Sequence, residues 1–119
     1  MGKYENIQMG YKKLYNLSIQ ISEMIEADNY SEIFVLMELK DKVISELNKY
    51  KEDIDKTYRI EFADIIKKIN ENEKKNIEIL EKRKKETEKL INKASEGNKL
   101  LSAYMTYKEN KGNILDFRK

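Results

Sequence analysis

The sequence predicts an all-α fold: an antiparallel three-helix bundle with an overlong third helix and a short fourth helix near the C-terminal end. Apolar residues recur at steps of three and four along nearly the whole chain of 119 residues, and this spacing places side chains on one face of a helix. The chain contains no proline, the residue that interrupts helices most strongly. Two short polar breaks, near residues 28 and 53, make successive helices antiparallel neighbours.

The first helix is expected over residues 3–27. Gly10 lies inside it and weakens it by roughly 1 kcal/mol relative to alanine, without ending it. The apolar stripe that should face the core consists of Ile7, Tyr11, Leu14, Leu17, Ile21, Met24 and Ile25.

The second helix is expected over residues 30–50. Asp28 and Asn29 break the preceding pattern, and either can cap this helix through its side-chain oxygen, with Ser31 as a rival cap. Lys40 lies within the apolar stripe, where its stem can cover the edge of the core while its ammonium stays in water. The stripe consists of Ile33, Leu36, Lys40, Val43, Leu47 and Tyr50, with Met37 and Ile44 beside it.

The second helix begins with five consecutive apolar residues, 33–37. At ~100° per residue, five residues go right round a helix. Phe34 and Val35 therefore point away from the main stripe, one to each side of it. Either the start of this helix is buried on several sides by its own bundle, or these residues form a patch that faces a partner.

The third helix organises the chain. Residues 51–56 form a polar connection, and Asp55 or Thr57 can cap the helix that follows. A continuous helix over residues 57–104 would span roughly 70 Å at ~1.5 Å per residue, much longer than the other two. Residues 81–89 contain no apolar side chain and should be solvated. The far half of this helix therefore needs something else on which to pack.

The C-terminal part carries a second apolar cluster. Residues 95–98 should break or kink the helix, because most of them have poor helix propensity. We expect residues 1–96 to form the bundle and residues 97–119 to form a C-terminal helix, over about 98–108, and a tail of the same domain. That helix can fold back onto the bundle or dock on another chain.

Composition excludes most catalytic chemistry. There is no cysteine and no histidine, so the thiol nucleophile, the commonest general base and the commonest metal ligand are missing. The four glycines are scattered and form no phosphate loop. We expect no enzyme activity, no catalytic residues, no cofactor and no metal.

The balance of charge and hydropathy bears on partners and location. The 24 basic and 22 acidic residues nearly cancel to +2, unlike the charge of a nucleic-acid-binding protein. No apolar run approaches the ~20 residues of a membrane span, and the start has no apolar signal-peptide core. We expect a cytoplasmic protein with neither nucleic-acid binding nor membrane insertion.

The sequence resembles the FliT-type flagellar export chaperones, with the matching features in the same order along the chain. The resemblance covers most of the chain. It includes a first helix rich in tyrosine and leucine, the turn Ala27-Asp28-Asn29-Tyr30-Ser31, the segment Leu36-Met37-Glu38-Leu39-Lys40 and a long charged third helix. The ending Gly97-Asn98-Lys99-Leu100-Leu101-Ser102-Ala103-Tyr104 is its most specific part.

The resemblance implies a function and its partners. Such proteins bind the C-terminal helical segment of the flagellar filament-cap protein in the cytosol, keep it unassembled, and deliver it to the flagellar export gate and its ATPase complex. Their C-terminal helix can cover the client groove. In this chain, we expect Leu101 and Tyr104 to form the lid. The expected client-binding groove consists of Phe34, Val35, Leu39, Ile77, Leu80, Leu90, Ile91 and Ala94.

Two alternatives stay open. The chain can be a chaperone of hook–filament junction proteins, built on the same bundle. It can also be a structural coiled-coil protein that self-associates through its third helix, although the gap at residues 81–89 argues against a continuous seam. A homodimer formed through the apolar ends is possible.

Overall fold

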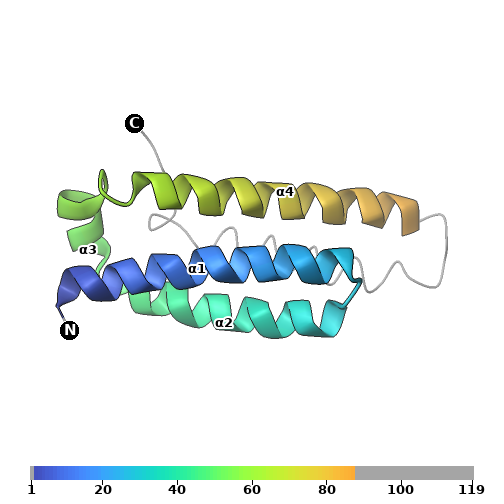
Figure 1. Ribbon diagram of the computed structural model, residues 1–119, viewed down its shortest axis with the longest axis horizontal. Helices are drawn as coiled ribbons and strands as arrows, with labels where there is room; N and C mark the ends of the chain where they lie inside the picture. Colours follow the sequence, from blue (N-terminus) through green and yellow to red (C-terminus); the bar gives the residue numbers. More distant parts are fainter. Residues whose placement is uncertain (1, 88–119) are drawn as a thin grey trace.

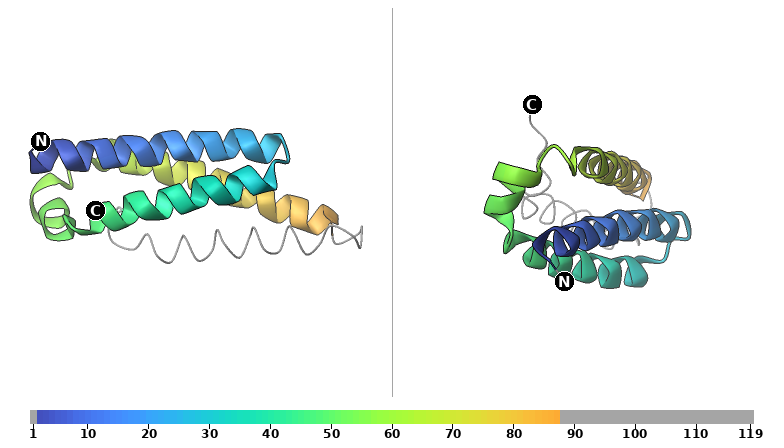
Figure 2. Two further views of the ribbon diagram at one scale, coloured as in Figure 1. Left: turned by 90° about the horizontal axis from the view of Figure 1, so that it is seen from below. Right: turned by 60° about the vertical axis from the view of Figure 1, so that its left-hand side comes forward.

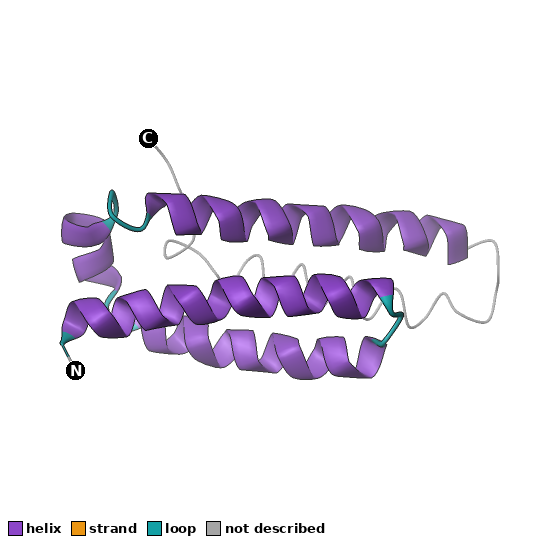
Figure 3. Cartoon of the chain, viewed as in Figure 1, coloured by secondary structure: helices purple, strands orange, loops and turns teal. Residues whose placement is uncertain are grey.

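The computed structural model describes residues 2–87 of the chain. In this part the helices are α1 (Lys3–Glu26), α2 (Tyr30–Asn48), α3 (Lys51–Asp53), the π-helix η1 (Ile54–Tyr58) and α4 (Ala63–Thr87). Helices α1 and α4 run in one direction and α2 returns in the other (Figure 1). The described residues contain helices and loops but no strand (Figure 3). The expected fourth helix lies outside them.

Helix α1 is the central element, because it packs against both α2 and α4. Its bounds agree with the prediction, and all of its expected stripe is buried except Met24, which is half-buried. Gly10 has a packing role that the sequence did not reveal. A Cβ at this position would lie 2.6 Å from Cδ2 of Leu47, so the glycine allows α2 to approach α1 closely.

The turn between α1 and α2 is fixed by side chains. Asp28 adopts a left-handed backbone conformation with φ of 55°. The side chain of Asn29 accepts a hydrogen bond from the backbone N–H of Glu32 at 3.3 Å and caps α2. Ser31, the rival cap, instead donates its hydroxyl to Asn29 Oδ1 at 3.2 Å.

The prediction of a polar connection at residues 51–56 is wrong, since α3 and η1 occupy this stretch. These helices cross one end of the bundle (Figure 2). Ile54 is buried there and anchors the segment. The main break falls at residues 59–62, so the long helix begins at Ala63 and not near Thr57.

Aromatic packing explains where the chain turns. The ring of Tyr4 lies 5.4 Å from the rings of both Tyr58 and Phe62, measured between centroids. The ring of Phe62 lies 5.2 Å from that of Tyr11. Tyr58, just before the break, and Phe62, its last residue, are therefore both held against α1.

Helix α4 has 25 residues, which correspond to about 37 Å at ~1.5 Å per residue. It continues through most of the charged run, as far as Thr87. The rest of the predicted helix, up to residue 104, lies outside the described residues. None of the helices described over residues 2–87 is long and apolar enough to cross a membrane.

Candidate functional site

The structure describes five of the ten predicted groove and lid residues. Phe34 and Ile77 are half-buried and Leu80 is buried. Val35 and Leu39 are exposed, at 49% and 42%. The other predicted residues, Leu90, Ile91, Ala94, Leu101 and Tyr104, lie outside the described part of the chain.

Three of these residues, Phe34, Ile77 and Leu80, come to similar levels along the bundle. Lys40 of α2 contacts Glu73 of α4, and the two helices run antiparallel (Figure 1). Phe34 lies six positions before Lys40, and Leu80 lies seven positions after Glu73. Since the rise per residue is the same in both helices, Phe34 and Leu80 come to similar levels, with Ile77 one turn away.

We call this region the α2–α4 face. Most of its members lie on the same side of their helix as Lys40 or Glu73, and Phe34 lies at the edge of that side. They are Phe34, Met37, Lys40 and Ile44 from α2, and Ile66, Glu73, Ile77 and Leu80 from α4.

Val35 and Leu39 lie on another side of α2. They precede Val43 by eight and four residues, so the three share a flank of the helix. Val43 lines a surface pocket together with Met9 and Gly10 of α1. The structure therefore places Val35 and Leu39 on the α1–α2 flank and does not bring them together with Ile77 and Leu80.

The centre of the α2–α4 face is a buried ion pair. The ammonium of Lys40 donates to Oε1 of Glu73, and the side chains are 0% and 2% exposed. The expectation that this ammonium stays in water is wrong, because a carboxylate on α4 meets it inside the protein. Taking two charges out of water is costly, and their attraction offsets that cost only when both partners are present.

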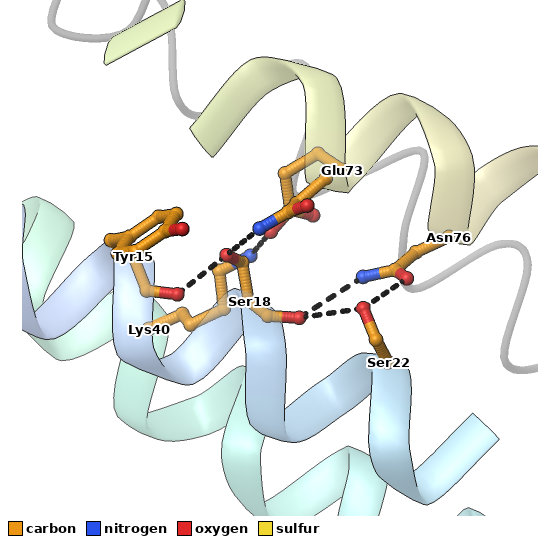
Figure 4. A network of polar contacts seen from close by, with 7 residues as sticks. Tyr15, Ser18, Ser22, Lys40, Glu73 and Asn76 are labelled. Carbon is orange, nitrogen blue, oxygen red and sulfur yellow. Dashed lines mark hydrogen bonds and ion pairs between the residues drawn. The ribbon is translucent and has the colours of Figure 1, made fainter. Parts of the chain in front are cut away.

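A polar network from α1 continues this layer (Figure 4). The amide Nδ2 of Asn76 donates to the carbonyl of Ser18 at 3.3 Å, and that of Asn72 donates to Ser18 Oγ at 3.3 Å. Ser22 Oγ lies 2.6 Å from Asn76 Oδ1 and 3.0 Å from the Ser18 carbonyl, either of which can accept its proton. These bonds tie α1 to α4 across the middle of the bundle.

One polar atom of this layer stands apart. Oε2 of Glu73 is buried and has no hydrogen-bond partner among residues 2–87. A buried acceptor without a donor bears the full cost of its lost hydration. The layer therefore contains one buried ion pair and one acceptor, Glu73 Oε2, without a donor among the described residues.

The end of the α2–α4 face is tied to the turn between α1 and α2. Nη1 of Arg83 in α4 donates to the carbonyl of Ile25 and to Oδ1 of Asp28 at 2.5 Å. The carbonyls at a helix C-terminus need such donors, and the last turn of α1 has no basic residue of its own. Part of the charged run that we expected to be solvated therefore stabilises the bundle.

Titration behaviour follows from burial. Removal from water raises the pKa of the Tyr11 phenol above its ordinary value, and the negative charge of Asp55 adds to this effect. Desolvation also raises the pKa of Asp41, while the neighbouring Lys40 opposes that change. No group of three acidic residues in the described chain is placed to hold a metal ion.

Glu73 and Asn76 were not among the residues predicted from the sequence. The signal was present, since the apolar stripe of α4 steps from Ile69 directly to Ile77 and leaves Glu73 at the intervening core position. A polar residue on a core stripe together with Lys40 on another indicates a buried pair. Sequence spacing alone did not show that the two residues would meet.

The comparisons with known proteins give the family. A family model described as flagellar protein FliT matches residues 10–106. No significant match was found among curated proteins or among solved structures. The FliT family consists of non-enzymatic chaperones, in agreement with the prediction that the chain is not an enzyme. Because the match spans most of the chain, the protein belongs to the FliT flagellar protein family, and this membership implies a role in flagellar export as a chaperone.

Proposed function

We propose that this protein is a cytoplasmic chaperone of the flagellar filament-cap protein. It binds the C-terminal helical segment of that client, prevents premature assembly, and delivers the client to the export gate and its ATPase complex. Family membership supports the general role. The structural observation behind the proposed mode of binding is the α2–α4 face. Both helices pack on α1 there, and each contributes apolar residues to the face.

A client helix fits this face by a known recognition mode. An amphipathic helix lays its apolar side into a groove between two helices and anchors residues at steps of three and four. Phe34, Ile77 and Leu80 are the described anchoring positions that we propose. Val35 and Leu39 would extend the contact with the client around α2. Leu90, Ile91 and Ala94 would extend the same contact beyond Leu80, toward the C-terminal end.

Access to the groove is the second part of the proposal. Leu80 is buried, so a client can reach it only after whatever covers it moves aside. We assign this covering role to the segment around residues 98–108, with Leu101 and Tyr104 as its anchors. The protein would then exchange its own segment for the client helix.

Truncation after Glu96 tests this exchange. A labelled peptide covering the C-terminal helical segment of the same organism's filament-cap protein is titrated with the full chain and with the truncated form. Removal of a cover raises the affinity, because the client no longer competes with the protein's own segment. Lower affinity would show that the C-terminal segment belongs to the binding site.

A further inference from the structure

The unpartnered oxygen of Glu73 sets a requirement on any occupant of the α2–α4 face. Its Oε1 is engaged by the ammonium of Lys40, while Oε2 is buried without a donor among the described residues. The side chain is only 2% exposed, so bulk water does not solvate it. This atom can accept one more hydrogen bond.

The charge of the site selects the kind of donor. Lys40 already balances the carboxylate of Glu73, so the pair has no net charge. A lysine or arginine from a partner would bring an uncompensated positive charge into a buried layer, and that is costly. A neutral donor on asparagine, glutamine, serine or threonine satisfies Oε2 without adding charge.

The surroundings select the shape of the partner. Apolar residues lie on both sides of Glu73 along α4, namely Ile66 and Ile69 before it and Ile77 and Leu80 after it. The Lys40 pair thus sits between two apolar stretches. A complementary helix therefore presents apolar residues to both stretches and one polar residue between them.

We propose that the client helix recognised by this chain carries a single neutral hydrogen-bond donor within its apolar face, and that this donor binds Glu73 Oε2. This inference rests on the proposed function, since it describes the client of the same face. The contact gives specificity: a helix that places leucine opposite Glu73 leaves the acceptor unsatisfied, whereas a helix with the donor removes the penalty.

A double-mutant cycle between protein and peptide tests the proposal. The full chain and its variant Lys40→Met/Glu73→Leu are titrated with the filament-cap C-terminal peptide. They are also titrated with versions in which each Asn, Gln, Ser or Thr of its apolar face is replaced singly by leucine. At one position, the replacement should weaken binding to the native chain about tenfold or more and leave binding to the double variant unchanged or stronger.

The controls separate this claim from the proposed function. Lys3 and Asp53 form an exposed pair at 3.3 Å, so Lys3→Met/Asp53→Leu removes the same two charges away from the α2–α4 face and should show no coupling. If the core variant does not fold, Lys40→Gln/Glu73→Gln replaces it, because it removes both charges together and leaves neither buried alone. Its amide oxygen is a weaker acceptor than a carboxylate and should reduce the coupling at the same peptide position.

Two results would overturn the inference. If the native chain binds the peptide but no polar position couples to Glu73, the donor requirement is wrong while the proposed function stands. If neither the native chain nor any variant binds any of the peptides, both the proposed function and the inference fail.

Discussion

The buried pair of Lys40 and Glu73 gives the sharpest prediction on stability. Replacing Lys40 by methionine leaves the Glu73 carboxylate buried without its counter-charge, and replacing Glu73 by leucine leaves the ammonium in the same position. Because the two side chains are 0% and 2% exposed, each single substitution should cost about 3–5 kcal/mol of unfolding free energy. The double variant Lys40→Met/Glu73→Leu should lie within about 1 kcal/mol of the native protein or be more stable.

Urea denaturation followed by far-UV circular dichroism measures all four proteins, and the double-mutant cycle gives the coupling energy. The exposed pair of Lys3 and Asp53 serves as the matched control, with an expected coupling of at most about 1 kcal/mol. If Lys40→Met and Glu73→Leu cost no more than Lys3→Met, the pair is not shielded from water and the description of the α2–α4 face is wrong.

Three further predictions concern other contacts. Gly10→Ala should destabilise the protein by about 1–2 kcal/mol despite better helix propensity, because its Cβ would lie 2.6 Å from Leu47 Cδ2; the additional substitution Leu47→Ala should make Gly10→Ala harmless, and additive denaturation energies would refute the clash. Arg83→Gln should lower the free energy of unfolding by about 1–3 kcal/mol, since the charged donor from α4 to the last turn of α1 is lost. Thermal unfolding checks this against Lys82→Gln, an exposed neighbour whose substitution should have little effect. Above about pH 10, the ordinary pKa of tyrosine, the unfolded chain loses the Tyr11 proton while the folded chain keeps it, so stability falls as the pH rises; Tyr11→Phe should show a shallower fall in denaturation across that range, and an identical slope would count against the raised pKa.

The helices could be predicted from sequence because their cause is local. The apolar spacing of residues 3–27 and 30–50 and the capping side chain of Asn29 lie within a few positions of what they determine. The corner at residues 51–62 could not be predicted in the same way. It depends on contacts of Phe62 with Tyr4 and Tyr11, which are more than 50 positions away in the sequence.

The candidate site shows the same division. The different positions of Phe34 and Val35 around α2 follow from helical phase, and the structure has Phe34 half-buried and Val35 exposed. The contact between Lys40 and Glu73 depends on the register between α2 and α4, which are separated in the sequence by residues 49–62. Local spacing contains no information on that register, so a lysine on a core stripe looked like an edge residue.

The central claim is that a client helix binds the α2–α4 face. The most direct measurement is a titration of the labelled filament-cap C-terminal peptide with the full chain, Ile77→Asp and Ile60→Asp. Ile77 is half-buried on that face, and Ile60 is 90% exposed away from it. Saturable binding at micromolar or better affinity should be lost with Ile77→Asp and kept with Ile60→Asp. Equal binding by both variants would contradict the location, and absence of binding by both the full chain and the form truncated after Glu96 would contradict the client.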